Sequence, residues 1–252
     1  MKVSVITAVY NREKTIGDAI DSLYKQTYQN FEQIIVDGLS KDRTVEIIKY
    51  RSDLRTLIKS EEDRGIYDAF NKGLLRSTGD IIGFLHSDDF YSDEEILSEV
   101  VRAFQTSGCD LVYGDLDYVS EADTSKIIRN WISGGFEFKK LKYGWMPPHP
   151  TVFVRRELVK DIGLFDLNYR IAADYDYMLR CLKKRNIKVC YLPKKIMKMR
   201  VGGASNGSLR FIIKKSLEDY SIIKKNMIFL IFPLLTLVMK NFRKLNQFKV
   251  AN

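Results

Sequence analysis

Cysteine is scarce in this sequence. Its three cysteines, Cys109, Cys181 and Cys190, are far apart, and none belongs to a Cys-x-x-Cys pair. The pattern argues against a metal or redox site built on cysteine. We expect three reduced thiols packed inside a cytoplasmic protein.

Long apolar runs, a signal peptide and repeats are also missing. A membrane-spanning helix needs roughly 18 uninterrupted apolar residues. The nearest approach, MIFLIFPLLTLVM at 227–239, is shorter and contains Pro233. The first apolar run has the pattern of a strand rather than of a secretion signal. We therefore expect no spanning helix.

What the sequence does contain is enough for a globular fold. The chain has 252 residues, of which 45% are hydrophobic, so it can build one large domain or two small ones. Its 41 Lys and Arg against 32 Asp and Glu give a net charge of +9. That excess favours anionic partners: nucleotides, nucleic acid or an anionic lipid surface.

Hydrophobic periodicity predicts an α/β fold. Strand and helix patterns alternate through the first hundred residues, and the last helix is opened by the capping-box spacing of Ser92 and Glu95. We predict strands at 2–10, 31–37, 54–60 and 80–86, with helices over 13–26, from near Asp42, over 65–76 and after Glu95. This order predicts a Rossmann-like, mainly parallel sheet flanked by helices.

The second half of the chain is less regular. Short strand patterns occur at 110–114 and 126–131, followed by a Gly134–Gly135 turn. We predict one domain over 1–207, with a first half at 1–108 and a second-substrate half at 109–207. A helical, basic tail at 208–252, interrupted by Pro233, follows.

Polar residues follow three of the predicted strands, at Thr7–Asn11, Asp37–Ser40 and His86–Asp89. Ligands of open α/β sheets bind at the carboxyl ends of strands, so these clusters should meet on one rim. Adjacent carboxylates such as Asp88 and Asp89 suit Mg²⁺ or Mn²⁺. The alternative is a solvated turn in which Asp89 or Asp93 caps the next helix.

Two further features could serve a nucleotide. Asp37 could accept from a base N–H or a ribose hydroxyl, whereas Asp42 is placed to cap a helix. Arg64 and Lys72 could hold a phosphate or diphosphate, or could form an ordinary solvated helix face.

A helix starting near Asp174 carries a candidate base. Its predicted buried stripe is Tyr175, Met178, Leu179 and Leu182. Asp176 lies opposite the stripe beside Arg180 and Lys183, which predicts an exposed ion-pair face. Asp174 lies at the edge of the stripe in the first turn and can point into a cleft, so it is favoured as the acid–base residue.

The chain resembles family 2 glycosyltransferases with the GT-A fold. ITAVYNR, IIVDGLSKDRT, GIYDAFNKG and GDIIGFLHSDD occur in the order and spacing of that family, and HPTVFVRRELVKDIGLFD and AADYDYMLR match its acceptor side. The resemblance covers Lys2 to Ser205. Within the family the chain looks like bacterial enzymes that assemble O-antigen, colanic acid and other exopolysaccharides.

The resemblance implies a donor site. Thr7, Ala8, Tyr10 and Asp37 would hold the nucleoside of a sugar nucleotide. HSDD occupies the Asp-x-Asp position, with Asp88 the ligand of Mn²⁺ or Mg²⁺. The chain departs from the family where His86 replaces the first aspartate, which leaves the role of position 86 open; Asp89 remains beside Asp88.

It also implies acceptor-side roles. Asp174 matches the general base, usually written Glu-Asp where this chain has Ala173-Asp174. His149 would face the acceptor, although a buried structural histidine is the more common interpretation. MRVGGAS resembles a loop closing over the diphosphate, with Arg200 a phosphate contact, or it is a plain glycine turn.

The function so implied is that of a metal-dependent, inverting hexosyltransferase. It would move a sugar, as from a UDP-hexose, to a hydroxyl of a lipid-linked saccharide in lipopolysaccharide O-antigen or exopolysaccharide synthesis. The acceptor hydroxyl loses its proton to Asp174 and attacks the sugar from the face opposite the departing diphosphate.

The basic tail favours a location on the inner face of the cell membrane. Lysines and arginines flank its apolar run, a pattern typical of peripheral segments at anionic lipid. They are Lys214, Lys215, Lys224, Lys225, Lys240, Arg243, Lys244 and Lys249. The alternative is a helix pair packed on the core or in an oligomer contact.

Two other functions compete with this one. A nucleic-acid-binding module would suit the +9 charge, but the basic residues concentrate in the tail and form no aromatic-interleaved sheet motif. A nucleotidyltransferase should carry a glycine-rich phosphate loop after the first strand, and TAVYNREKTIG has none. We expect no nucleic-acid partner.

Overall fold

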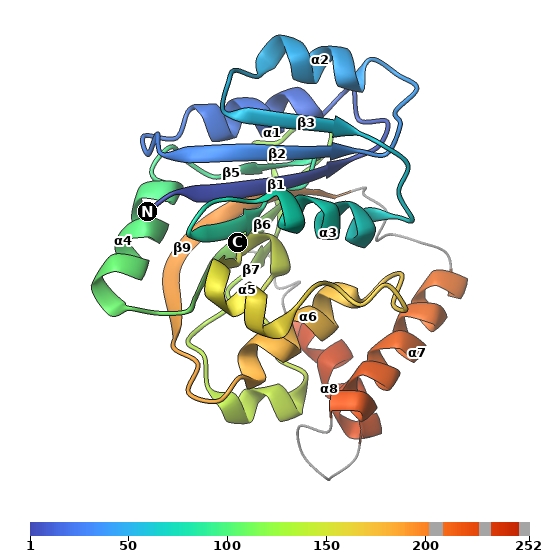
Figure 1. The fold of residues 1–252 in the computed structure, drawn as a ribbon. Helices are drawn as coiled ribbons and strands as arrows, with labels where there is room; N and C mark the ends of the chain where they lie inside the picture. Colours follow the sequence, from blue (N-terminus) through green and yellow to red (C-terminus); the bar gives the residue numbers. More distant parts are fainter. Residues whose placement is uncertain (202–208, 227–232, 247–252) are drawn as a thin grey trace.

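A nine-stranded mixed sheet forms the centre of the protein (Figure 1). The computed structural model describes residues 1–201, 209–226 and 233–246. The strands follow the order β3-β2-β1-β4-β8-β6-β9-β5, and β7 pairs with β6. Strands β1 to β4 are parallel to one another, whereas β8 runs antiparallel to both β4 and β6. The predicted α/β fold is confirmed.

The first half alternates strand and helix as predicted. Its elements are β1 (Val3–Val9), α1 (Ile16–Tyr24), β2 (Phe31–Asp37), α2 (Thr44–Arg51), β3 (Thr56–Ser60), α3 (Ile66–Arg76), β4 (Ile81–Phe84), β5 (Asp89–Tyr91) and α4 (Ile96–Ser107). Helices α1 and α2 cover one face and α3 the other (Figure 1). Accordingly, Ile35 packs with Ile16 and Ile48, while its neighbours Ile34 and Val36 pack with Phe70. Burial on both faces explains why β1 and β2 are nearly continuous apolar runs.

The second half adds the rest of the sheet and the helices beside it. Its elements are β6 (Leu111–Ser120), β7 (Ile127–Trp131), η1 (Phe138–Tyr143), η2 (His149–Thr151), β8 (Phe153–Arg155), α5 (Arg156–Ile162), α6 (Ala173–Lys183), β9 (Val189–Val201), α7 (Leu209–Asn226) and α8 (Pro233–Asn246). The four residues of the predicted stripe on α6 are all buried. Pro233 begins α8, the position in a helix that proline tolerates best.

The predicted capping box before α4 is wrong. The Ser92 hydroxyl donates to the carbonyl oxygen of Lys195 on β9 instead of capping the helix. The residue before α4 is Glu95, whose own N–H donates to Asp93 Oδ1 at 2.9 Å. Because β9 passes beside this turn, it supplies an acceptor that the local sequence does not reveal. Asp89 is no helix cap either, since it lies in β5 and pairs with Met199.

The tail helices pack on the rest of the fold. Ile222 and Ile223 of α7 belong to the main hydrophobic core, and the Thr236 hydroxyl of α8 donates to the Lys142 carbonyl at 2.8 Å. This is the packing that the alternative interpretation of the tail expects, but one side of α7 stays exposed, with Ile213 and Leu217. The apolar stretch at 227–232 and Lys249 lie outside the described residues, as do the side chains of Arg243 and Lys244. Every helix in the described ranges falls short of the length and apolar character needed to cross a bilayer.

Lys240 is not a surface residue, contrary to the predicted basic flank. Its side chain is 5% exposed, its Nζ lies 2.6 Å from Asp219 Oδ1, and it stands 3.2 Å from the centroid of the Tyr175 ring. Burial lowers the pKa of Lys240 to about 7, although the Asp219 charge opposes that shift. Asp219 also pairs with Lys215 at 2.9 Å.

Stability should therefore depend on pH through Lys240. A lysine titrates near 10.4 in an unfolded chain, so between pH 7 and 10 the unfolded state binds the extra proton. The free energy of unfolding should rise with pH over this window, by up to about 1.4 kcal/mol per unit. Urea denaturation of wild type and Lys240→Met between pH 7 and 10 tests this. The difference in free energy of unfolding between wild type and Lys240→Met should change with pH. If the two free energies change in parallel with pH, the buried titration of Lys240 is contradicted.

Candidate active site

Three polar loops meet at one edge of the sheet. Strand β1 pairs in parallel with β2, Val9 opposite Asp37, and with β4, Ile6 opposite Phe84. The residues that follow these strands therefore emerge on the same side, as the sequence predicted.

Hydrogen bonds lock the first two loops together. The Asn11 N–H donates to Ser40 Oγ at 2.8 Å, and the Lys41 N–H donates to Asn11 Oδ1 at 2.8 Å. Asn11 has a φ of 49°, in the left-handed region that asparagine tolerates better than most residues. The rim is thus shaped before any ligand arrives.

Asp37 is fully buried behind this rim. Its carboxylate accepts from the Ser40 N–H at 3.1 Å, from the Ser40 hydroxyl, and from the Ser60 hydroxyl at 2.6 Å. Gly38 follows, and a Cβ there would lie 2.5 Å from Asp63 Oδ2, so a larger residue would displace the Asp63 side chain. The carboxylate can accept about four hydrogen bonds, so three internal donors leave room for one from a ligand.

The other predicted nucleoside residues differ in exposure. Tyr10 is 53% exposed and offers its ring on the rim. Thr7 is buried, with the Gln33 side-chain amide 3.4 Å from its hydroxyl, and Ala8 is buried beside it. Of these three, Tyr10 is the one whose side chain can reach a nucleoside.

His86, Asp88 and Asp89 form a compact ligand cluster after β4. Each offers one ligand atom, and the three atoms lie within 4.8 Å of one another. Asp89 is fully buried, and neither of its oxygens has a well-formed hydrogen bond within 1–201, 209–226 or 233–246, although the Arg200 N–H and charge act on this carboxylate and oppose the rise in its pKa that burial causes. His86 Nε2 is buried without a partner in those same ranges. Buried polar atoms are nearly always satisfied, so the donor set of this cluster fits a divalent cation.

The charges in the cluster also favour a bound cation. Burial, and after it the neighbouring Asp88 charge, raises the pKa of Asp89 well above its usual value. Burial lowers the pKa of His86, while Asp88 and Asp174 oppose that shift. A hard divalent ion offsets the carboxylate repulsion and suits carboxylate ligands such as Asp88 and Asp89.

Asp174 lies in the first turn of α6, half-buried, close enough to this cluster for its charge to act on His86 and His149. Its Oδ1 accepts from the Tyr175 N–H at 2.9 Å and lies 3.2 Å from the Tyr67 hydroxyl. Burial first, and then the Asp174 charge, raises the pKa of Tyr67, which keeps that hydroxyl protonated. Asp174 is thus oriented by neutral donors.

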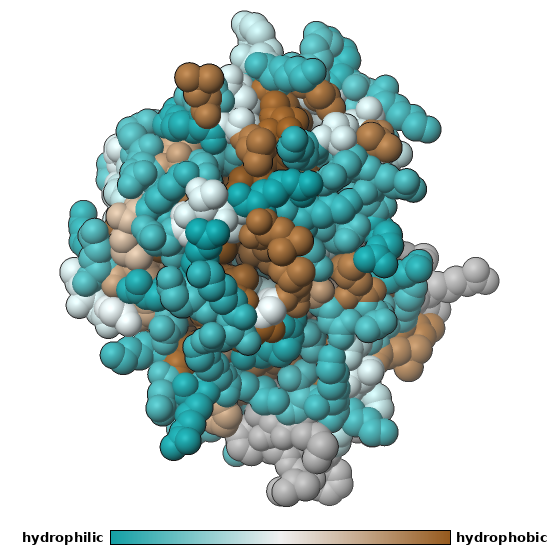
Figure 2. Space-filling model, viewed as in Figure 1, coloured by the Kyte–Doolittle hydropathy of each residue, from teal (hydrophilic) through white to brown (hydrophobic). Residues whose placement is uncertain are grey.

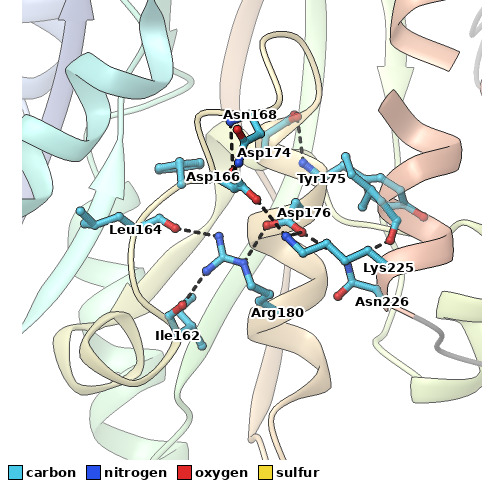
Figure 3. A network of polar contacts seen from close by, with 12 residues as sticks. Ile162, Leu164, Asp166, Asn168, Asp174, Tyr175, Asp176, Arg180, Lys225 and Asn226 are labelled. Atoms are coloured by element: carbon cyan, nitrogen blue, oxygen red, sulfur yellow. Dashed lines mark hydrogen bonds and ion pairs between the residues drawn. The ribbon is translucent and has the colours of Figure 1, made fainter. Parts of the chain in front are cut away.

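The predicted exposure of Asp176 is wrong. Asp176 is fully buried, with Arg180 Nε at 2.7 Å and Asn226 Nδ2 at 3.3 Å (Figure 3). The same guanidinium donates to the carbonyls of Ile162 and Leu164. Helix α7 supplies Asn226 and covers this face, which the pattern of α6 alone cannot indicate. Asp176 is committed to this network and Asp174 is not.

His149 is packed in an aromatic cluster behind His86. It is 5% exposed, and its ring centroid lies 4.8 Å from that of Phe84 and 6.1 Å from that of His86. Burial lowers the pKa of His149 to about 4, so the ring is neutral at neutral pH. This favours the buried structural interpretation over contact with an acceptor phosphate.

The three basic residues predicted to bind phosphate differ in how fully other protein groups already contact them. Arg64 is 78% exposed and lies 3.7 Å from Asp68, so it is free to turn toward a ligand. Lys72 contacts the Glu62 carbonyl and Asp68. Arg200 donates to the Asp88 carbonyl at 2.8 Å and pairs with Asp18.

Arg200 is 8% exposed, and its bond to the Asp88 carbonyl ties β9 to the loop that carries the His86–Asp88–Asp89 cluster. It also lines a cavity of about 440 Å³ with Asp18, Phe90 and Asp93.

Sequence reasoning missed two residues that serve this site. Ser60 satisfies Asp37 together with Ser40 of the predicted rim, and Tyr67 contacts Asp174. Tyr67 lies inside the GIYDAFNKG motif, and Ser60 is the last residue of β3, so strand-end position was the available signal.

A mixed α/β sheet with an acidic cluster and a separate carboxylate at one edge fits the GT-A class of transferases that the sequence resembles. The family model described as "Glycosyl transferase family 2" matches residues 4–163. The chain belongs to that family, which sets aside the nucleotidyltransferase and the nucleic-acid-binding module. It is a glycosyltransferase.

Relatives carry the same family name. A "PGL/p-HBAD biosynthesis glycosyltransferase" of Mycobacterium bovis (strain BCG / Pasteur 1173P2) is 31% identical over 212 residues, covering 81% of this chain and 78% of that protein. An "Uncharacterized glycosyltransferase" of Haemophilus influenzae is 30% identical over 235 residues, covering 88% of each.

Solved structures share the fold. S. aureus TarS 1-349 in complex with UDP-GlcNAc matches all of this chain and 76% of that one, with TM-score 0.71 and 22% identity. A longer TarS structure matches 90% of this chain and 44% of that one, with TM-score 0.63. Mannosyltransferase PcManGT from Pyrobaculum calidifontis, in complex with GDP-Man and Mn2+, has TM-score 0.66 and 18% identity over 96% of this chain and 68% of that one.

Proposed function

We propose that this glycosyltransferase is an inverting, metal-dependent hexosyltransferase that moves a sugar from a UDP-sugar to a hydroxyl of a lipid-linked saccharide. The observation that carries the proposal is the His86–Asp88–Asp89 cluster, whose buried atoms lack hydrogen bonds among the described residues and whose His86 feels the charge of Asp174. The pathway we propose is bacterial surface polysaccharide synthesis, of O-antigen or exopolysaccharide.

Each residue has a role on the donor side. Tyr10 lies against the base, and Asp37 accepts from a base N–H or a ribose hydroxyl. Asp88 and Asp89, with His86, would hold Mn²⁺ or Mg²⁺, which would supply positive charge for the departing diphosphate. Arg64, the exposed cation at the rim, adds to that charge.

The transfer itself is a single displacement. Asp174 accepts the proton of the acceptor hydroxyl while the Tyr175 N–H holds its carboxylate in place. The acceptor oxygen forms a bond to C1 of the sugar as the bond from C1 to the diphosphate oxygen breaks, and the nucleoside diphosphate leaves with the electron pair. Attack from the opposite face inverts the configuration at C1.

A panel of sugar nucleotides tests the proposal. UDP-glucose, UDP-galactose, UDP-GlcNAc and GDP-mannose are offered with Mn²⁺ and a synthetic lipid-diphosphate sugar. We expect turnover with a UDP-sugar, loss of turnover with chelator, and a product of inverted anomeric configuration by NMR. Retained configuration, or full activity with chelator, would overturn those parts of the proposal.

The membrane part of the proposal rests on α7. Ile213, Leu217 and Tyr220 are exposed at helical spacing, and Lys214 and Lys224 are exposed on the same helix. Figure 2 shows apolar surface at the right edge, over the place of α7 in Figure 1. An apolar stripe with lysines is typical of helices that lie on anionic lipid. We therefore place the enzyme in the cytoplasm, peripheral on the inner face of the membrane.

Vesicle binding should depend on this stripe. The Ile213→Asp/Leu217→Asp variant should bind phosphatidylglycerol vesicles at least about tenfold more weakly, since it loses apolar burial and gains charge. Leu54→Asp, at a fully exposed position after α2, is the matched control and should bind like wild type. Sedimentation with vesicles measures both; equal binding of all three proteins would refute the assignment.

A further inference from the structure

One carboxylate of α7 binds three consecutive backbone N–H groups just before α6. Glu218 Oε1 accepts from the Arg170 N–H at 3.2 Å, and Oε2 accepts from the Ile171 and Ala172 N–H groups at 2.8 and 3.0 Å. Glu218 is 46 to 48 residues away in the chain. The sequence near α6 gives no signal from which this contact could be predicted.

The N-terminus of α6 needs such a partner. Ala172 is its N-cap and has no side chain that can accept, whereas helices usually begin with Ser, Thr, Asp or Asn. Glu218 does not replace a capping side chain, which would accept from the second or third N–H of the helix; it accepts from the N–H of Ala172 itself and of the two residues before it. Its negative charge suits the positive end of the α6 dipole, so α7 fixes the segment that leads into α6.

The segment that Glu218 holds also carries Asp174. The carbonyl of Ile171 lies 2.8 Å from the Tyr67 hydroxyl, the same group that lies 3.2 Å from Asp174 Oδ1. In residues 170–172, the three backbone N–H groups therefore donate to Glu218, and the Ile171 carbonyl accepts from Tyr67. Any shift of this segment displaces Asp174 as well.

Helix α7, which carries Glu218, is anchored to the region around α6 by several polar contacts. Lys225 Nζ lies 2.8 Å from Asp166 Oδ2, and Asn226 donates to Asp176, so the far end of α7 is tied to the same region (Figure 3). The neighbouring Asp219 is buried against Lys215 and Lys240. Glu218 therefore projects from a helix that is held at its C-terminal end and at the neighbouring Asp219.

We propose that Glu218 is a positioning residue that holds the N-terminus of α6 so that Asp174 faces the acceptor hydroxyl. This inference rests on the proposed role of Asp174 as the base. It makes the tail helix α7 part of the catalytic apparatus, because the placement of α7 determines the aim of Asp174.

The test compares steady-state kinetics of three variants. Glu218→Ala should lower kcat about 10²-fold, the cost of a small misplacement of a reacting group. The KM for the UDP-sugar and the Kd for UDP with Mn²⁺ should stay within about twofold, since the donor site is untouched. Glu218→Gln keeps an accepting oxygen and should recover at least about tenfold of that loss. Ser221→Ala changes an exposed position of α7 and should stay within about threefold of wild type.

A double-mutant cycle separates positioning from general support. If Glu218 acts through Asp174, then adding Glu218→Ala or Glu218→Gln to Asp174→Asn lowers the residual kcat no further. Equal losses in both backgrounds, or wild-type kcat in Glu218→Ala, would overturn the positioning role while leaving the base assignment intact. Full activity of Asp174→Asn alone would instead refute the base. Should Glu218→Ala fail to fold, Glu218→Gln carries both comparisons.

Discussion

Asp174→Asn should lower kcat by about 10² to 10⁴-fold and leave the KM for the donor nearly unchanged. An amide keeps the size of the side chain and its contact with Tyr67 but cannot accept the proton of an acceptor hydroxyl, and general base catalysis is worth a factor of that order. Nucleotide release with a saturating acceptor measures the effect.

Asp176→Asn is the matched control, two residues along the same helix. Asp176 is buried against Arg180, and breaking a buried pair costs roughly 3 to 5 kcal/mol of stability. This variant should lose thermal stability but keep the kcat of its folded fraction. The opposite outcome, an inactive Asp176→Asn and an active Asp174→Asn, would exchange the roles of the two carboxylates.

Asp88→Ala should weaken Mn²⁺ binding and lower kcat by about 10² to 10⁴-fold. It removes one of three ligands that lie within 4.8 Å of one another, and a cation beside a leaving diphosphate is worth several kcal/mol. Calorimetric titration with Mn²⁺ alone measures binding without any assay of transfer. A variant that binds Mn²⁺ like wild type would contradict the site.

Asp93→Ala serves as the control for this prediction. Asp93 comes two residues after β5, the strand that begins at Asp89. It pairs with Lys194 at 3.2 Å and is not part of the ligand cluster. It should bind Mn²⁺ and turn over like wild type. His86→Ala adds a further comparison, because position 86 is where the chain departs from the family pattern and its imidazole is in the cluster.

Much of the site was predictable because it follows from local pattern. Strand 31–37 was predicted residue for residue, and the ends of β1, β2 and β4 locate the polar loops that meet at the rim. Helical periodicity also separated Asp174 from the buried stripe of α6. These features depend on how apolar and polar residues alternate within a short segment, and that pattern can be read directly from the sequence.

Other features could not be predicted, since they depend on distant segments. The Ser92 hydroxyl bonds to β9 rather than to its own helix. Lys240 belongs to a basic tail yet is buried against Asp219. Residues that a local pattern assigns to solvent become interior when another helix packs over them.

The sequence by itself determined the parallel strands β1 to β4, the rim with Asp37 and Asp88, and the position of Asp174 at the start of a helix. Only the tertiary structure decided how β5, β8 and β9 join the sheet, which charges are buried, which atoms of Asp89 and His86 lack partners among the described residues, and which residue holds the segment before α6. The reason is that periodicity encodes which face of a segment turns inward. What that face meets, such as Glu218 at the N-terminus of α6, is set by the packing of segments far apart in the chain.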